Sequence, residues 1–118
     1  MSYIDFMVIP VPKAKLKDYK KLVKKSAEAW KRVGALAYVE AIADDVKPGK
    51  KTSYPQAVKL KDDEVVGCAY IIFESKAHRN KCWKLIMKDP FMANFDPKTI
   101  PFDAKRMFFG GFKKIAGF

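Results

Sequence analysis

The chain has 118 residues, 49% of them apolar and 14% aromatic, and a formal net charge of +11. This composition is typical of a folded globular protein and excludes a disordered chain, so residues 1–118 are expected to form a single domain. No apolar run approaches the roughly 18 residues that a membrane span needs, and the first residues lack the features of a secretory signal. We therefore expect a cytoplasmic protein without a membrane segment.

Lysine carries most of the positive charge, since only three of the 24 basic residues are arginine. Lysine is a strongly hydrated point charge, whereas base recognition and bidentate phosphate binding favour arginine. The charge is therefore expected on a solvated surface, with weak non-specific nucleic-acid binding as the alternative. The two cysteines, Cys68 and Cys82, lack metal-ligand spacing and have one histidine to join them, so buried thiols and no metal site are expected.

The first third of the chain predicts a strand followed by a helix. Residues 3–11 are apolar at both alternating positions, as in a strand covered on both faces, and Pro10 and Pro12 are expected to end it. Residues 14–33 repeat apolar side chains every three or four positions, and Gly34 supplies a C-terminal stop. The polar face of this helix is interpreted as a solvated surface or as an anion-binding surface. Its candidate anion-binding residues are Lys17, Lys20, Lys24 and Lys31.

The middle of the chain predicts a second strand and a polar connection. Residues 35–46 have alanine at most alternate positions, and this alanine face is expected to lie against the packed helices. The opposite face consists of Tyr38, Glu40, Ile42 and Asp44. Residues 47–63 begin and end with turn residues, and the part from 54 to 60 is expected to form either a helical turn or an added strand.

The second half of the chain repeats the order strand, helix, strand. Residues 64–74 are apolar at both alternating positions, which predicts a central strand. A helix is expected over 76–88 with Ser75 as its N-cap, and a loop over 91–104 leads to the last strand, 106–115. The core face of this helix is expected to consist of Cys82, Leu85 and Ile86.

Two strand–helix–strand halves of this length predict an α+β protein with the ferredoxin-like βαββαβ order. Both helices would then lie on one face of a four-stranded antiparallel sheet. The strands over 3–11, 64–74 and 106–115 are nevertheless apolar or aromatic on both faces, so a second copy of the chain is expected to cover the open face. The prediction is a homodimer joined sheet to sheet, a dimeric α/β barrel.

Three segments resemble the DUF1428 family of uncharacterised bacterial proteins, within the dimeric α/β-barrel superfamily. They are YIDFMVIPVPK at 3–13, YVEAIADDVKPGKKTSYPQAVKLKDDEVV at 38–66 and IPFDAKRMFFGGF at 100–112. The resemblance covers essentially the whole chain and implies the dimeric ferredoxin-like fold, but no particular chemistry. The chain departs from the family pattern at Phe6, where glycine is common, and a phenylalanine there is expected to reduce any cavity beside the first strand.

The motifs of known chemistries are incomplete in this chain. The only histidine, His78, opens the second helix, where haem-degrading members of the superfamily have a histidine, but Asp5 and Tyr70 stand where their partner residues would be. No nucleophile-elbow motif accompanies His78 in support of a catalytic triad, and Gly110-Gly111 lacks the pattern of a phosphate loop. No cofactor is expected, and the sequence leaves open whether the protein is an enzyme.

Polar and aromatic side chains are expected to gather at one rim of the sheet. They are interpreted as an ion-pair network that fixes the dimer, or as a pocket in which a carboxylate acts as a base. The candidates are Tyr3, Asp5, Tyr38, Glu40, Asp44, Tyr54, Tyr70, Phe102, Asp103 and Arg106. The leading hypothesis is a homodimer that binds a small aromatic or apolar molecule between sheet and helices. The alternatives are anion or RNA binding through the first helix, and a structural or stress-related dimer without a ligand.

Overall fold

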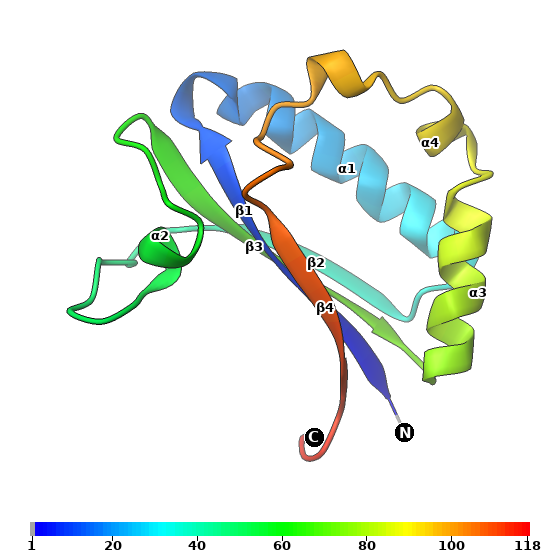
Figure 1. Ribbon diagram of the computed structural model, residues 1–118. Helices are drawn as coiled ribbons and strands as arrows, with labels where there is room; N and C mark the ends of the chain where they lie inside the picture. Colours follow the sequence, from blue (N-terminus) through cyan, green and yellow to red (C-terminus); the bar gives the residue numbers. More distant parts are fainter. Residues whose placement is uncertain (1) are drawn as a thin grey trace.

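The computed structural model describes residues 2–118 as a four-stranded antiparallel sheet with two long helices on one face (Figure 1). The strands, in the spatial order β2-β3-β1-β4, are β1 (Tyr3–Pro12), β2 (Ala37–Ile42), β3 (Glu64–Phe73) and β4 (Phe108–Lys113). The helices are α1 (Leu16–Val33), α2 (Tyr54–Ala57), α3 (Lys76–Ile86) and α4 (Pro90–Ala93). Single 3-10 turns occupy Lys13–Lys15 and Pro97–Thr99. The predicted ferredoxin-like α+β fold is confirmed.

The pairing register decides which side chains lie beneath the helices. Asp5 of β1 lies opposite Ile71 of β3, and both are completely buried. The next residue, Phe6, lies opposite Tyr70 and is 45% exposed on the other face of the sheet. Because side chains alternate along a strand, Phe6 points away from the helices. Phe6 therefore does not narrow the space between sheet and helices, and the expected reduction of a cavity beside the first strand can apply only to the open face.

An aromatic core fixes α1 and α3 on the sheet. The ring of Trp30 from α1 lies edge-on to Phe73 of β3, with 5.9 Å between the ring centroids. It lies edge-on to Trp83 of α3 as well, at 4.9 Å. Edge-to-face pairs of this kind stabilise a core beyond the area that they bury. The α1 helix ends where expected, because Gly34 adopts a left-handed conformation with φ of 103°.

The alanine face of β2 lies on the open side of the sheet, contrary to the prediction. Ala37 and Ala41 pair with Ile72 and Cys68, which share the open face with Phe6. The side chain of Glu40 lies beneath α1 instead, hydrogen-bonded to a tyrosine of that helix. The reason is that a half-buried carboxylate needs donors, which α1 supplies, whereas alanine has no such requirement.

Two further predictions are corrected. Leu85 was expected in the core, but it is 41% exposed, and α3 buries Cys82 and Ile86. Pro10 was expected to end the first strand, yet β1 continues to Pro12. The carbonyl of Pro10 accepts a hydrogen bond from the Asp103 amide at 3.3 Å. The nitrogen of Pro10 points toward the same edge of β1 as this carbonyl. The pairing of β1 with β4 ends at Val8, so no ladder hydrogen bond is lost at Pro10.

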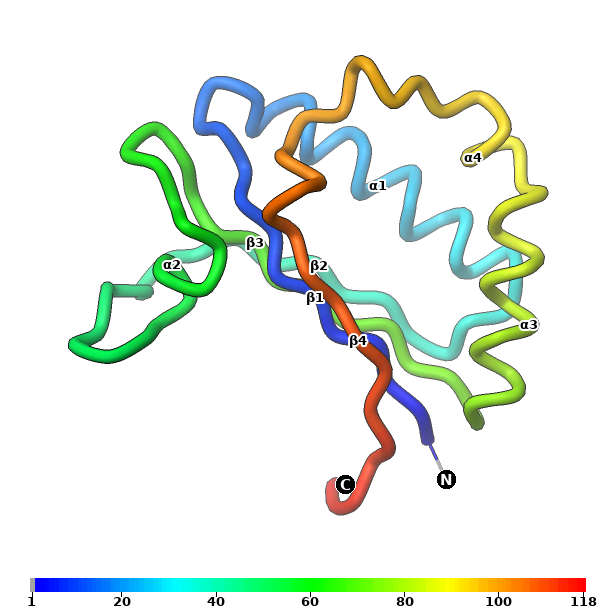
Figure 2. Tube along the Cα trace, in the orientation of Figure 1, coloured from blue at the N-terminus to red at the C-terminus, as the bar shows by residue number. Residues whose placement is uncertain are grey.

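The segment 43–63 lies on the open side of the sheet, away from α1 and α3 (Figures 1 and 2). Its one helical element is α2, so the alternative of a helical turn is confirmed for the start of 54–60. The Ser53 side chain caps α2 by accepting a hydrogen bond from the Gln56 amide at 3.3 Å. Val58, which follows α2, is 1% exposed. This segment covers only one end of the open face.

Candidate functional site

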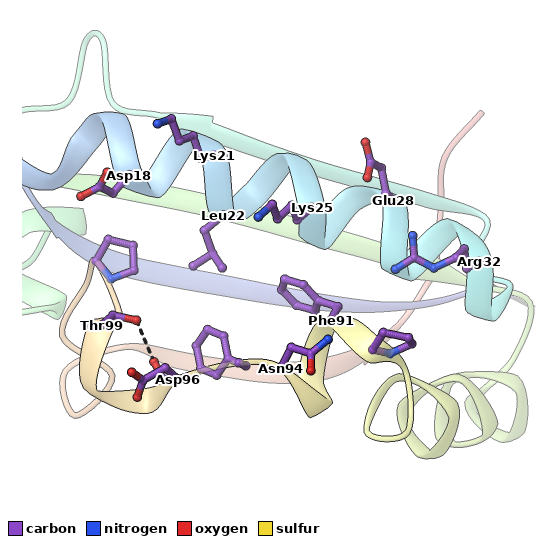
Figure 3. A pocket seen from close by; sticks show the side chains of 13 residues that line it. Asp18, Lys21, Leu22, Lys25, Glu28, Arg32, Phe91, Asn94, Asp96 and Thr99 are labelled. Carbon is purple, nitrogen blue, oxygen red and sulfur yellow. Dashed lines mark hydrogen bonds between the residues drawn. The ribbon is translucent and has the colours of Figure 1, made fainter.

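A groove of about 680 Å³ lies between α1 and residues 89–101, a segment that we call the strap (Figure 3). Leu22 extends from α1 toward the strap, and Phe91 extends from the strap toward α1. Phe95 lines the same space. Polar side chains border these apolar ones, and they are Asp18, Lys21, Lys25, Glu28, Arg32, Asn94, Asp96 and Thr99. An apolar groove with a polar border suits a small amphipathic molecule.

Both ends of the strap are fixed. Arg32 donates to Asp89 from Nε at 3.1 Å and from Nη2 at 2.8 Å, and Asp89 also accepts from the Phe91 amide at 2.9 Å. The hydrogen bonds from Arg32 and the amide lower the pKa of the Asp89 carboxyl. At the other end, the ring of Phe102 lies edge-on to Tyr19 at 6.0 Å. The groove therefore has a fixed width at both ends, whereas the middle of the strap is largely exposed.

Asp5 forms a buried ion pair beneath α3. Its carboxylate accepts from Arg79 Nε at 3.1 Å and from Trp83 Nε1 at 2.7 Å, and Arg79 Nη2 lies 3.0 Å away. The guanidinium of Arg79 also lies over the ring of Tyr3, 5.6 Å from its centroid. Gly111 of β4 is opposite Asp5, and a Cβ there would lie 2.5 Å from the Tyr3 ring. These contacts hold α3 against the sheet and leave Asp5 inaccessible to a ligand.

Glu40 is held between two tyrosines beneath α1. Tyr38 donates to Oε1 at 2.5 Å, and Tyr19 donates to Oε2. Burial raises the pKa of the Glu40 carboxyl, although both hydrogen bonds act in the opposite direction. Burial and the charge of Glu40 raise the pKa of both phenols. A Cβ at Gly67 would lie 3.3 Å from the Tyr19 hydroxyl, so a glycine gives that hydroxyl room.

Arg106 connects three segments at the end of the sheet where β3 begins. It forms a bidentate pair with Glu64, at 2.7 and 2.6 Å, and donates from Nε to Asp103 at 2.8 Å. It also donates to the carbonyls of Val58 and Lys59, at 3.3 and 3.0 Å. The hydrogen bonds from Arg106 lower the pKa of both carboxyls. Arg106 therefore fixes the connection after α2 within one chain.

Comparison with known proteins identifies the family. A family model described as "Protein of unknown function (DUF1428)" matches residues 2–104. The chain belongs to the DUF1428 family. The "Uncharacterized protein YbaA" of Escherichia coli strain K12 is 40% identical over 115 residues, which cover 98% of this chain and 97% of the relative. The protein of the same name from Shigella flexneri matches equally well.

Solved structures share the fold of this DUF1428 protein at low sequence identity. A dimeric ferredoxin-like protein from an uncultured marine organism has a TM-score of 0.67 and 12% identity, covering 100% of this chain and 98% of that one. SnoaB, a cofactor-independent oxygenase from Streptomyces nogalater solved as a mutant, has a TM-score of 0.61 and 11% identity, covering 98% and 95%. At such identities the likeness shows the fold alone.

The DUF1428 chain distributes the predicted rim residues over several places. Asp5 and Tyr3 lie with Arg79, and Tyr38 and Glu40 lie with Tyr19. Asp103 and Arg106 lie with Glu64, and Phe102 packs on Tyr19. Tyr70 faces the open side near Phe6, at 6.4 Å between centroids. Asp44 and Tyr54 line a second pocket on the open side. None of the ten lines the groove along α1.

Sequence reasoning missed the partners of these residues and the groove itself. A buried phenol or indole usually needs a hydrogen-bond partner, so Tyr19 in the helix 14–33 and Trp83 in the helix 76–88 were signals for such contacts. The groove residues Leu22 and Phe91 lie in a helix face and in a presumed loop, with no motif in common. The predicted anion-binding lysines, Lys17, Lys20, Lys24 and Lys31, are exposed on α1.

Two kinds of feature are absent from residues 2–118. Within that range no helix is long and apolar enough to cross a membrane. No group of three or more histidine, cysteine or acidic side chains in the same range is arranged to hold a metal ion. The two thiols are free, and burial raises the pKa of both Cys68 and Cys82. Neither cysteine is therefore set up as a thiolate nucleophile.

Proposed function

We propose that this protein binds a small apolar or aromatic molecule with an anionic group, in the groove between α1 and the strap. The observation that carries the proposal is the combination of a volume of about 680 Å³ with an apolar interior. This volume lies within the usual range for small-molecule pockets, roughly 300–1,000 Å³. Its apolar side chains, which include Leu22 and Phe91, supply the main driving force for an apolar ligand.

Lys25 is the residue that would receive the anionic group. It lines the groove on α1, and no acidic side chain within residues 2–118 pairs with it. By contrast, Arg32 at the end of the groove is already occupied by Asp89. A ligand carboxylate near Lys25 would therefore meet a cation that needs no partner to be displaced.

The residues that line the groove support ligand binding. They leave open whether the protein is also an enzyme. The groove is lined by no histidine, cysteine or tyrosine of the described chain, and its carboxylates are those of Asp18, Glu28 and Asp96. All three of these residues are exposed.

Calorimetric titration with aromatic carboxylates and their matching amides tests the proposal. We expect the carboxylates to bind more tightly than the amides, and Lys25→Gln to remove that preference, a change of up to about fivefold at a surface site. Lys24→Gln is the matched control, because Lys24 neighbours Lys25 but does not line the groove. The proposal fails if no carboxylate binds, or if the two variants behave alike.

We propose further that the protein is a homodimer joined through the open face of the sheet. The side chains on the central part of that face are uncharged, and several large ones are exposed, among them Phe6 at 45%, Phe108 at 46% and Phe112 at 55%. Contiguous apolar surface of this kind favours association, and a two-fold dimer would cover it with the same surface. Sedimentation velocity across a range of protein concentrations measures the mass of the particle, and a monomer throughout would reject the dimer.

An anion-binding surface on α1 is the second candidate. Lys17, Lys20, Lys24 and Lys31 are exposed and share one side of the helix by their spacing, and none has an acidic partner within residues 2–118. RNA affinity that falls steeply with salt, and falls further when these lysines are changed to glutamine, would support it. Affinity that ignores both changes would reject it.

A further inference from the structure

The last five residues carry two large apolar side chains that nothing within residues 2–118 covers. In this C-terminal tail, Lys114–Phe118, the side chain of Ile115 is 94% exposed and that of Phe118 is fully exposed. A single backbone hydrogen bond, from the Lys114 amide to the Ser2 carbonyl at 3.1 Å, holds the start of the tail beside β1. Two such side chains in water gain nothing from the fold, and their burial elsewhere would be favourable.

A small apolar pocket lies on the open face at the far edge of the sheet. It has a volume of about 250 Å³. Its walls come from the end of β2, from the open-face side of β3 and from the segment that leads to α2. The lining residues are Ala41, Ile42, Ala43, Asp44, Val46, Tyr54, Val66 and Cys68. The pocket is smaller than is usual for a small-molecule site, and its size is better suited to one or two side chains.

The pocket and the tail occupy diagonally opposite corners of the open face. Ile42 of β2 pairs with Gly67, which pairs with Ile9 of β1, whereas Lys113 of β4 pairs with Tyr3 at the other end of β1. The two corners are therefore separated by roughly 20 Å along the strands and roughly 14 Å across them. One tail cannot turn back onto the pocket of its own chain without crossing the whole open face (Figures 1 and 2).

We propose that the tail of each copy fills this pocket on the other copy. The inference rests on the sheet-to-sheet dimer proposed above. A two-fold axis that lies in the interface, perpendicular to the diagonal that joins the two corners, exchanges them, so each tail meets the partner's pocket. With these separations the strands of the two sheets cross at roughly 70°, closer to the orthogonal than to the aligned way in which sheets pack.

Charge at the two corners is complementary. Lys113 and Lys114 lead into the tail, whereas Asp44 lines the pocket and Asp45 follows it. None of the four takes part in an ion pair within the described chain, residues 2–118. Two cations beside two carboxylates would fix the direction in which the tail enters, and opposite charges across an interface favour the correct pairing.

The occupied pocket would be a composite site, completed by a residue of the partner. Phe118 or Ile115 would lie against Val66 and Cys68, while Tyr54 would close the outer side. Cys68 is half-buried in one chain, and the tail would shield its thiol from solvent. The tail would thus extend the apolar interface beyond the central part of the sheet and give each chain a second point of attachment.

Disulfide trapping tests the contact directly. In a Cys68→Ser background, the double variant Tyr54→Cys/Phe118→Cys should form a reducible covalent dimer on mild oxidation. Each single variant should stay uncross-linked. The matched control is Lys98→Cys/Phe118→Cys, because Lys98 is exposed on the strap, on the helix side of the sheet. Mixing isotopically labelled with unlabelled chains and analysing the linked peptides by mass spectrometry would show that the bond joins different chains.

A second measurement separates this inference from the dimer itself. Ile115→Ser/Phe118→Ser should raise the dimer dissociation constant by at least about tenfold, and Asp44→Lys should weaken the dimer, with partial recovery when Lys114→Glu is added. A dimer that shows no cross-link and keeps its affinity in these variants overturns the tail contact and leaves the dimer standing. A wild-type protein that is monomeric overturns both.

Discussion

The two faces of the sheet differ in polarity and in how far the chain covers them. The face beneath α1 and α3 contains two carboxylates, Asp5 and Glu40. Asp5 accepts from two residues of α3, and Glu40 accepts from Tyr19 of α1 and from Tyr38 of β2. The central part of the open face has no charged side chain, and α2 covers only one end of it. Buried charge needs particular partners at fixed distances, whereas apolar area is covered by any surface of matching shape. The chain covers the first face by itself and leaves most of the second exposed.

The largest effect is expected from a charge placed on the open face. Phe112→Asp should raise the dimer dissociation constant by about a hundredfold or more, because a carboxylate would be buried against apolar side chains of the other copy. Phe109→Asp is the control, since Phe109 is also 55% exposed on β4 but belongs to the other parity and stacks on Trp83. Sedimentation equilibrium measures both constants. Equal weakening by the two variants would mean that the open face is not the interface.

The next effect concerns the face beneath the helices. Asp5→Ala should lower the free energy of unfolding by about 2–4 kcal/mol, because it leaves Arg79, whose side chain is only 21% exposed, without its counter-ion. The double variant Asp5→Leu/Arg79→Met should lose much less stability, because it removes both charges and fills their place with apolar side chains. Urea denaturation at a fixed protein concentration, with tryptophan fluorescence as the signal, compares them. If the double variant is as unstable as the single one, the ion pair does not explain the loss.

A smaller effect is expected where β4 passes the buried ion pair. Gly111→Ala should cost roughly 1–3 kcal/mol, because the added Cβ would lie 2.5 Å from the Tyr3 ring. At the neighbouring Gly110 the nearest atom to an added Cβ is 3.6 Å away, which is ordinary contact. Gly110→Ala should therefore change the stability by no more than about 0.5 kcal/mol, or increase it slightly. Thermal unfolding of the two variants side by side distinguishes crowding from a general intolerance of alanine in β4.

The smallest effect is a dependence on pH at Glu40. Its pKa is raised in the folded state, so the neutral carboxyl is favoured there. The stability that Glu40 contributes should therefore fall as the pH rises from its ordinary pKa through the folded value. Relative to Glu40→Gln, the wild type should lose stability as the pH rises from about 4 toward neutrality. Denaturation of both proteins across this pH range gives the sign of the change in their stability difference. A wild type that becomes more stable relative to Glu40→Gln as the pH rises would contradict the prediction.

Periodicity was enough to predict the order of the elements and the fold. Strands 3–11 and 64–74 are apolar on both faces, and the spacing in 14–33 leaves few alternatives to a packed helix. Periodicity does not say which face of a strand meets the helices, and this is why the alanine face of β2 was assigned to the wrong side. Which face of β2 meets the helices depends on Tyr19, which lies in α1 and donates to Glu40.

The site was predicted less well because its contacts join distant parts of the chain. Asp5 and Arg79 are 74 positions apart, and Arg106 and Glu64 are 42 apart. The charges themselves were visible, but their pairing depends on the register of β1 with β3 and on the path after α2. The groove depends on where the strap lies, and a loop without periodicity gives no information about its path.

The three arginines have a consequence for how the surface of this protein can change. Arg32, Arg79 and Arg106 supply the cation of every side-chain ion pair within residues 2–118, and no lysine does. Replacing any of them with lysine would remove the planar set of guanidinium N–H donors that forms these pairs. The lysines are thus separable from the architecture. Reductive methylation or acetylation of surface lysines should therefore leave the fold of the single chain intact.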